Sequence, residues 1–270
     1  MSWRCGKPLA VALAAALLPL SAGGFIPEPE RIARAIARAN IDAKRDQPLR
    51  FDVVLRIDGG PVVAQGELET HPQGYARLEL RGADGLRERH LLTRAGRQAT
   101  RNGARLDEPR AFLPPLFLLQ GDSVSQVRTS LAAFGIDAWL IGLAPCGDEN
   151  CYVVGDPSRV PPPFPAPEGG SESAAPRIAP TAAGSLWLEK EGFDPRRLVS
   201  PGGSRVDLGP GVVFESIRVP AWFEIQEPDR PPARFEVQGV SQSRLSPEAY
   251  DRAWVMGTPG SSDAVPVRSP

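Results

Sequence analysis

Residues 184–240 decide the fold: GSLWLEKEGFDPRRLVSPGGSRVDLGPGVVFESIRVPAWFEIQEPDRPPARFEVQGV. Short runs in this stretch alternate apolar and polar residues, which puts successive side chains on opposite faces of a strand. The apolar positions that we expect to face one side are Leu186, Leu188, Leu198, Val206, Leu208, Val213, Ile217, Val219, Phe223, Ile225, Phe235 and Val237. Clusters of Gly, Pro and Asp separate the runs and reverse the chain. The stretch therefore predicts a chain of hairpins.

Connections this short force neighbouring strands to be antiparallel, because a parallel return needs a long crossover. Residues 51–102 repeat the same alternation, with turns at 58–61, 71–74 and 82–85. Together the two halves predict a mainly β fold, with some α, built on one curved antiparallel sheet of roughly ten strands. A sheet of that size curls into an open barrel.

Two amphipathic helices are available to cover the mouth of this barrel. Residues 28–45 place Ile32 and Ile36 on one side and several arginines on the other. A second helix begins after Ser123, which forms a capping pattern with Gln126, and ends at Gly135. The apolar, Pro-broken run 112–119 precedes it; we expect this run to pack as core, with a movable lid as the alternative.

The first 24 residues have the pattern of a secretory signal: Arg4 and Lys7, an apolar stretch at 9–20, then small residues. Cys5 lies too early for a lipid attachment site, so we expect an exported, soluble, non-lipidated protein. The remaining cysteines, Cys146 and Cys151, predict a disulfide across a hairpin end. A redox pair or half of a metal site are the rival interpretations. A redox pair usually has two intervening residues, and no further Cys or nearby His completes a zinc site.

We expect a single open-barrel domain over 25–256, after the signal peptide 1–24. A Pro-rich loop at 157–183 interrupts the domain, and 257–270 forms a disordered tail. The formal net charge of −1 argues against a nucleic-acid partner. We expect a monomer.

The sequence offers no constellation for catalysis. Its two histidines, His71 and His90, belong to no metal-binding pattern, and no phosphate-binding loop or nucleophile elbow occurs. We therefore expect no enzyme activity, no metal and no cofactor. An apolar hollow inside the barrel, too large for its own side chains, would instead suit an acyl chain. The candidate lining residues are Phe51, Val53, Leu55, Leu78, Leu80, Phe117, Phe214 and Phe223. For each of them plain core packing is the alternative, and Phe214 has the weaker case because its parity differs from that of Val213 and Ile217.

Three stretches resemble the LolA-like superfamily of periplasmic outer-membrane lipoprotein carriers. They are Gly66–Leu68 with Tyr75–Leu80 and Gly85; Leu113–Asp122; and Leu186–Leu188 with Pro195–Leu198, Val213–Phe214 and Pro220. The resemblance implies an open barrel whose mouth is plugged by helices and whose cavity shields acyl chains of lipids or lipoproteins in the periplasm. In such carriers an arginine near the mouth responds to ligand, but no arginine of this sequence matches it. The alternative on the same barrel is an envelope sensor or interaction protein that binds an envelope membrane protein through the barrel and the Pro-rich loop.

Overall fold

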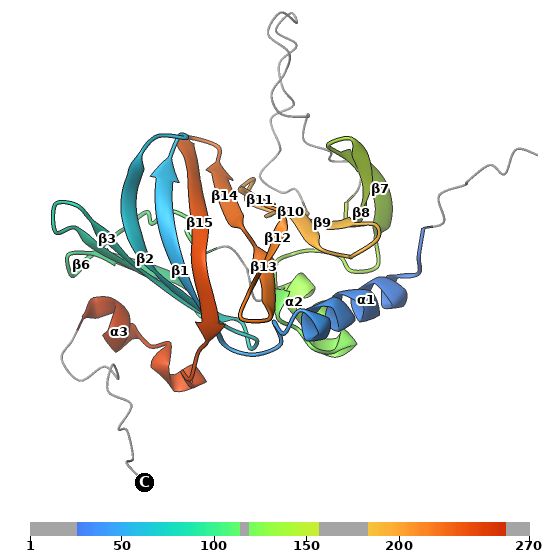
Figure 1. Cartoon of the computed structure of the whole chain (residues 1–270), viewed down its shortest axis with the longest axis horizontal. Helices are drawn as coiled ribbons and strands as arrows, with labels where there is room; N and C mark the ends of the chain where they lie inside the picture. Colours follow the sequence, from blue (N-terminus) through green and yellow to red (C-terminus); the bar gives the residue numbers. More distant parts are fainter. Residues whose placement is uncertain (1–25, 114–118, 157–182, 258–270) are drawn as a thin grey trace, which may run out of the picture.

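The computed structural model describes residues 26–113, 119–156 and 183–257 (Figure 1). The predicted signal peptide and residues 114–118, which include Phe117, lie outside these ranges, as do residues 157–182 of the Pro-rich loop and 258–270 of the tail. None of the helices in the described part of the chain is long and apolar enough to cross a membrane.

The described chain is dominated by one antiparallel sheet of 13 strands, in the order β6-β5-β4-β3-β2-β1-β15-β14-β11-β10-β9-β8-β7. A further hairpin, β12 with β13, pairs apart from it. The strands are β1 Leu49–Ile57, β2 Val62–His71, β3 Tyr75–Gly82, β4 Arg87–Thr93, β5 Gly96–Arg101, β6 Ala104–Arg105, β7 Ile141–Cys146, β8 Glu149–Gly155, β9 Ser185–Glu189, β10 Pro195–Val199, β11 Arg205–Leu208, β12 Gly211–Phe214, β13 Ile217–Pro220, β14 Trp222–Glu227 and β15 Arg230–Gln242.

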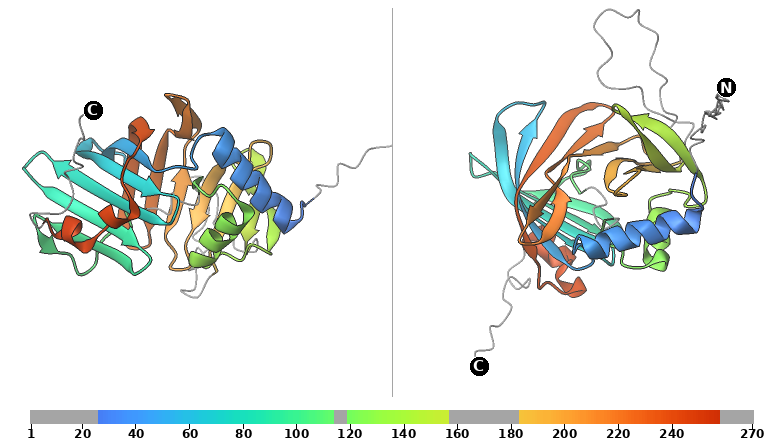
Figure 2. Two further views of the ribbon diagram at one scale, coloured as in Figure 1. Left: turned by 90° about the horizontal axis from the view of Figure 1, so that it is seen from below. Right: turned by 45° about the vertical axis from the view of Figure 1, so that its right-hand side comes forward.

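The long strand β15 joins the two halves of the chain by pairing with β1. Phe51 lies opposite Val240 and Leu55 opposite Phe235 in this pairing. The sheet curls strongly on either side of the junction, while β6 and β7 stand at the two ends of the strand order and do not pair with each other (Figures 1 and 2). The predicted fold class, an open antiparallel barrel with helices, is confirmed.

Two helices lie together at one end of the barrel (Figure 2). Helix α1, Pro29–Asp42, begins with Pro29 in its first turn, where the missing amide is not needed. Helix α2, Val124–Ala133, is capped by Ser123, whose Oγ accepts a hydrogen bond from the Gln126 amide at 3.3 Å. Both helices turn apolar residues toward the interior of the barrel, as their spacing predicted.

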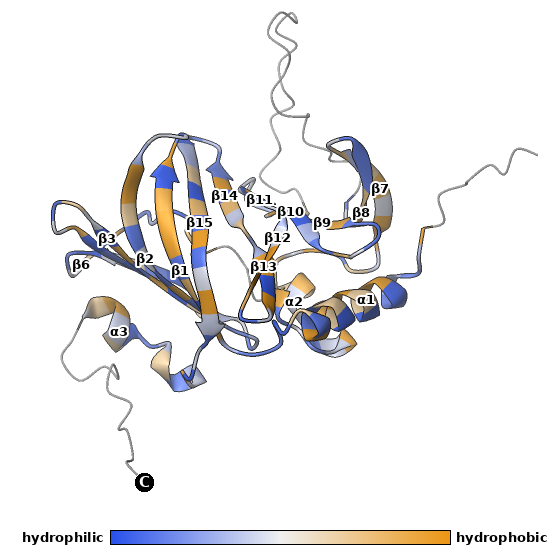
Figure 3. Cartoon of the chain, viewed as in Figure 1, coloured by the Kyte–Doolittle hydropathy of each residue, from blue (hydrophilic) through white to orange (hydrophobic). Residues whose placement is uncertain are grey.

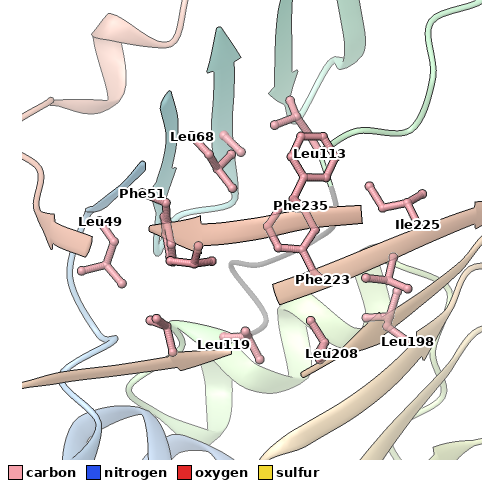
Figure 4. Packing of buried hydrophobic residues seen from close by; sticks show 14 of the residues in the cluster. Leu49, Phe51, Leu68, Leu113, Leu119, Leu198, Leu208, Phe223, Ile225 and Phe235 are labelled. Atoms are coloured by element: carbon pink, nitrogen blue, oxygen red, sulfur yellow. The ribbon is translucent and has the colours of Figure 1, made fainter. Parts of the chain in front are cut away.

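The inner face of the sheet and the helices share one apolar cluster. It includes Leu49, Leu68, Leu113, Leu119, Leu198, Leu208, Ile225 and Phe235, which converge from both halves of the chain (Figure 4). The rings of Phe223 and Phe235 stack at 4.8 Å between centroids. Along the strands, apolar and polar positions alternate (Figure 3), so the period of two in the sequence is the pattern that builds this core.

The β12–β13 hairpin corrects the prediction for Val213. This side chain is 65% exposed, whereas Phe214 is half-buried and packs against the core. Glu215 and Ser216 form a two-residue turn with positive φ at both positions, so Phe214 pairs directly with Ile217 and shares its face. The prediction assumed that the alternation of faces continues unchanged through the turn. It therefore placed Val213 on the wrong face and gave Phe214 too weak a case as a lining residue.

The outer face is partly covered by the segment 243–257, which we call the strap. It contains a 3₁₀ turn, Pro247–Ala249, and a short helix α3, Arg252–Met256. Trp254 lies near the guanidinium groups of Arg77 and Arg89, at 4.9 and 5.1 Å from the ring centroid. The strap is therefore helical in two short pieces.

The β7–β8 hairpin carries the disulfide between Cys146 and Cys151, whose Cα atoms are 5.7 Å apart. That separation is ordinary for a disulfide. On the outer face the bridge borders Trp187, Ala144 and Val153, so β9 is buried on both of its faces. The disulfide prediction is confirmed.

Candidate functional site

Most of the predicted lining residues come together on the inner face of the barrel. Six of them are buried members of the central cluster: Phe51, Val53, Leu55, Leu78, Leu80 and Phe223. Phe214 packs against the same cluster from the hairpin β12–β13. Phe117 lies outside the described residues. The structure thus places the candidates together without testing whether a ligand touches them.

The interior of the described part of the chain shows a gap much smaller than the large hollow that the sequence predicts. An apolar gap of about 10 Å³ lies there, which holds no more than a water-sized probe. Small-molecule sites typically need about 300 Å³ or more. Hollows of about 650 and 620 Å³ do occur, but they are open and lie on the outer face of the sheet, around Glu67 and around Arg205.

The small gap lies where the sheet meets its cover. Phe51 and Phe223 border it from the sheet, and Leu119 borders it from the segment that leads into α2. The remaining residues around it are Arg45, Leu49, Gln120, Val219, Pro220 and Val237. What closes the barrel here is a set of elements outside the 13-stranded sheet, and their contact with it is mainly apolar.

A buried polar cluster around Arg45 holds this cover in place. The Arg45 guanidinium donates to Oδ1 of Asn40 at 3.2 and 3.3 Å and to the Arg218 carbonyl at 3.3 Å. One of its nitrogens lies 3.6 Å from a carboxylate oxygen of Asp194. The cluster therefore joins the end of α1 to β13 and to the turn between β9 and β10.

The same cluster reaches the segment before α2. Asn40 Nδ2 donates to the Gly121 carbonyl at 2.8 Å, and Gln120 Nε2 donates to the Gln47 carbonyl at 2.7 Å. Burial lowers the pKa of Arg45 from its usual value, and Asp194 opposes this shift. Arginine stays charged at any physiological pH, so a buried cation sits beside the apolar gap.

Sequence reasoning missed these residues, although one signal was present. The helical spacing that buries Ile32 and Ile36 also buries Asn40, one turn further along the same stripe. A polar residue on a buried stripe requires hydrogen-bond partners, which here are Arg45 and Gly121. Arg45 itself had no local signal, because its partner Asp194 is 149 positions away in the chain.

A second polar group lies on the inner face toward the β6 edge. His90 Nε2 and Glu88 Oε1 are 2.7 Å apart, and Arg101 pairs with the other oxygen of Glu88 at 3.0 Å. Burial opposes ionisation of Glu88, but His90 and Arg101 outweigh it and lower the pKa of this carboxyl group. The His90 ring lies 5.1 Å from that of Phe112. None of these contacts supplies a nucleophile, and no metal-binding group of three or more His, Cys, Asp or Glu occurs in the described ranges.

Comparison of the sequence with family models and with curated proteins finds no match. Comparison with solved structures finds a LolA superfamily protein from Nitrosomonas europaea, with a TM-score of 0.50 and 9% identity, over 84% of this chain and 99% of that one. A putative outer membrane lipoprotein-sorting protein domain from Vibrio parahaemolyticus matches with a TM-score of 0.49 and 6% identity, over 84% and 99%. The chain has a LolA-like fold, as its sequence resemblance predicted.

Proposed function

We propose that this protein is an exported carrier that shelters the acyl chains of lipids or lipoproteins inside its barrel, without covalent chemistry. The observation that carries the proposal is the separate cover: a largely apolar inner face is closed by α1, α2 and the segment before α2, and these elements do not belong to the sheet. The proposed lining is Phe51, Val53, Leu55, Leu78, Leu80, Phe214 and Phe223, together with Phe117.

In this proposal the described state is the empty, closed carrier. An acyl chain enters by displacing the cover at the small gap, where Leu119 lies across from Phe51 and Phe223. Each methylene that leaves water contributes about 0.8 kcal/mol. The cargo and the cover bury the same apolar surface in turn. The free energies of the loaded and the closed state are therefore nearly equal, and a small change in either one reverses the equilibrium. Reversible loading is what a carrier requires.

The Arg45 cluster gives the closed state a defined geometry. Its hydrogen bond to the Arg218 carbonyl forms only when the end of α1 rests against β13. Opening exposes the guanidinium to water, which offsets the loss of this bond. The cluster therefore acts as a latch that closes again when the cargo leaves.

Export to an oxidising compartment, the periplasm, is part of the proposal. The pattern of residues 1–24 supports it, and so does the disulfide between Cys146 and Cys151, because disulfides persist in such compartments.

The small size of the interior gap favours a second candidate, an envelope sensor or interaction protein on the same barrel. A barrel that carries no cargo needs no hollow, and the described residues leave a gap of only about 10 Å³. Its partner would be an envelope membrane protein, with the Pro-rich loop 157–183 as the docking segment.

Native mass spectrometry of protein purified without detergent separates the two candidates. A carrier retains lipid or takes up a fluorescent fatty acid in a one-to-one complex. Val219→Phe, which places a larger side chain where an acyl chain would enter beside the apolar gap, should reduce uptake by about tenfold, equal to 1.4 kcal/mol. Val213→Phe is the matched control, since it makes the same change on the exposed face of the same hairpin. Absence of retained lipid together with absence of uptake by the wild type contradicts the carrier and favours the interaction protein.

A further inference from the structure

The turn between α2 and β7 displays two large apolar side chains to solvent. Trp139 is 66% exposed and Leu140 is 47% exposed. By contrast, Trp187 and Trp254 are only 1% and 4% exposed. We call Trp139 and Leu140 the apolar tip. Leaving an apolar ring in water is unfavourable.

The backbone under the apolar tip is fixed. The Trp139 amide donates to Oδ1 of Asp137 at 2.9 Å, and the Leu140 carbonyl accepts from the Gly155 amide on β8 at 2.9 Å. The buried side chain of Ile136 anchors the start of the turn in the core. The apolar tip is therefore held outward by local structure.

A guanidinium group lies directly beneath the tryptophan ring. The Cζ atom of Arg128, on α2, is 4.5 Å from the ring centroid of Trp139. Its Nη2 is enclosed and has no hydrogen-bond partner among the described residues. An enclosed donor without an acceptor is unfavourable, so the guanidinium gains a hydrogen bond if the Arg128 side chain turns outward to an anion at the surface.

We propose that the apolar tip docks on the surface of a phospholipid bilayer. The Trp139 ring and Leu140 enter the interface between headgroups and acyl chains, and Arg128 donates to a lipid phosphate. Tryptophan prefers this interface because its ring is largely apolar and its N–H is polar. Arginine forms strong, charge-assisted hydrogen bonds with phosphate oxygens.

A bilayer suits the apolar tip better than a protein partner does. A stable protein interface buries about 800 Å² on each side, which two side chains do not supply. A bilayer is fluid and closes around a small insertion, so the same two side chains suffice for weak, reversible binding. Because the apolar tip follows α2 directly, docking brings the covered end of the barrel toward the membrane. This inference does not depend on the cargo.

Co-sedimentation with vesicles of phosphatidylethanolamine and phosphatidylglycerol tests the inference on the full chain. Wild type should partition onto the vesicles, and brominated acyl chains should quench tryptophan emission in wild type but not in Trp139→Phe. The double variant Trp139→Ser, Leu140→Ser should bind about tenfold more weakly. Val213→Ser, an equally exposed apolar position, should bind as wild type does.

Arg128→Gln should weaken binding less than the double variant does and should reduce its dependence on salt, because the phosphate contact is electrostatic. Uptake of fatty acid, measured on the same samples, should stay unchanged in every one of these variants, which separates membrane docking from cargo binding. No partition of wild type, as expected if the apolar tip serves a protein partner, overturns the inference. Equal binding by wild type and the double variant overturns it as well.

Discussion

The two faces of this sheet are covered in different ways. On the inner face, α1 and α2 lie against the sheet mainly through apolar side chains, and their polar contacts gather at Arg45. On the outer face, the strap is tied to strand side chains: Thr100 Oγ1 donates to the Val255 carbonyl at 2.7 Å and Arg89 donates to the Trp254 carbonyl at 2.5 Å.

This difference in contacts indicates which of the two covers can leave the sheet. Apolar contacts carry no direction, so an acyl chain can replace most of the inner cover, and the strand groups that opening frees are the backbone N–H and C=O of Arg218, which bond to Ala43 and Arg45. Removing the strap instead breaks hydrogen bonds to Thr100 and Arg89 and exposes Trp254. We therefore expect the inner cover to open while the strap stays in place.

The largest stability loss is expected for Phe235→Ala. Phe235 is fully buried at 0% exposure and contacts the rings of both Phe223 and Phe112. Truncation should cost about 4 kcal/mol of unfolding free energy, measured by urea denaturation. Phe214→Ala, at a half-buried position of the same cluster, should cost clearly less. Equal losses of unfolding free energy would contradict the idea that the inner cluster packs most tightly around the Phe223–Phe235 pair.

A somewhat smaller loss, about 3 kcal/mol, is expected for Trp254→Ala. Here the ring leaves its place beside Arg77 and Arg89, so amide exchange should speed up in β4 and β5 more than in β1 and β15. Trp139→Ala is the matched control and should change stability by no more than about 0.5 kcal/mol. A uniform increase of exchange across the sheet would contradict a separately docked strap.

Removing the disulfide should cost about 2 kcal/mol, because the bridge closes a short loop in the unfolded chain. The variant is Cys146→Ala with Cys151→Ala, assayed by thermal and urea unfolding. Reduction of wild type should produce the same loss. A larger effect that spreads to α1 and α2 would show that the hairpin supports the inner cover as well.

The last prediction concerns the dependence of stability on pH, which the charges on the outer face control. Burial alone raises the pKa of Glu79, but hydrogen bonds from Arg87, Arg81 and Arg89 outweigh it and lower the pKa from 4.5 to about 2. A lowered carboxyl pKa stabilises the fold above 4.5, and this contribution is lost as pH falls from 4.5 to about 2.

Glu79→Gln should therefore flatten the dependence of unfolding free energy on pH in that window. Asp84→Asn, at an exposed turn, is the control and should keep the wild-type slope. An unchanged slope in Glu79→Gln would mean that the arginines do not hold this carboxylate in solution.

Local patterns predicted a large part of the structure. The period of two placed Leu78, Phe223 and Phe235 on the inner face, the capping pattern of Ser123 placed the start of α2, and the spacing of Cys146 and Cys151 gave the disulfide. These features depend on neighbours in the sequence. The pairing of β1 with β15 is not local, and the parity of Phe214 reversed at a turn that the sequence did not mark with glycine.

The sequence predicted the apolar residues of the candidate site but not its polar ones. Phe51 and Phe223 follow from alternation, but the buried Arg45 depends on Asp194 and Arg218, which lie far along the chain. The volume of the interior also escaped prediction, because it depends on how closely Leu119 approaches the sheet. Side-chain packing of this kind has no periodic signature.

Hydrogen exchange in the presence of a lysophospholipid tests the central claim most directly. We predict that ligand accelerates amide exchange in α1 and α2, while the strap at 243–257 and the pair β1–β15 exchange as before. Unchanged exchange in α1 and α2, with ligand bound in a one-to-one complex, would contradict a cover that opens for an acyl chain.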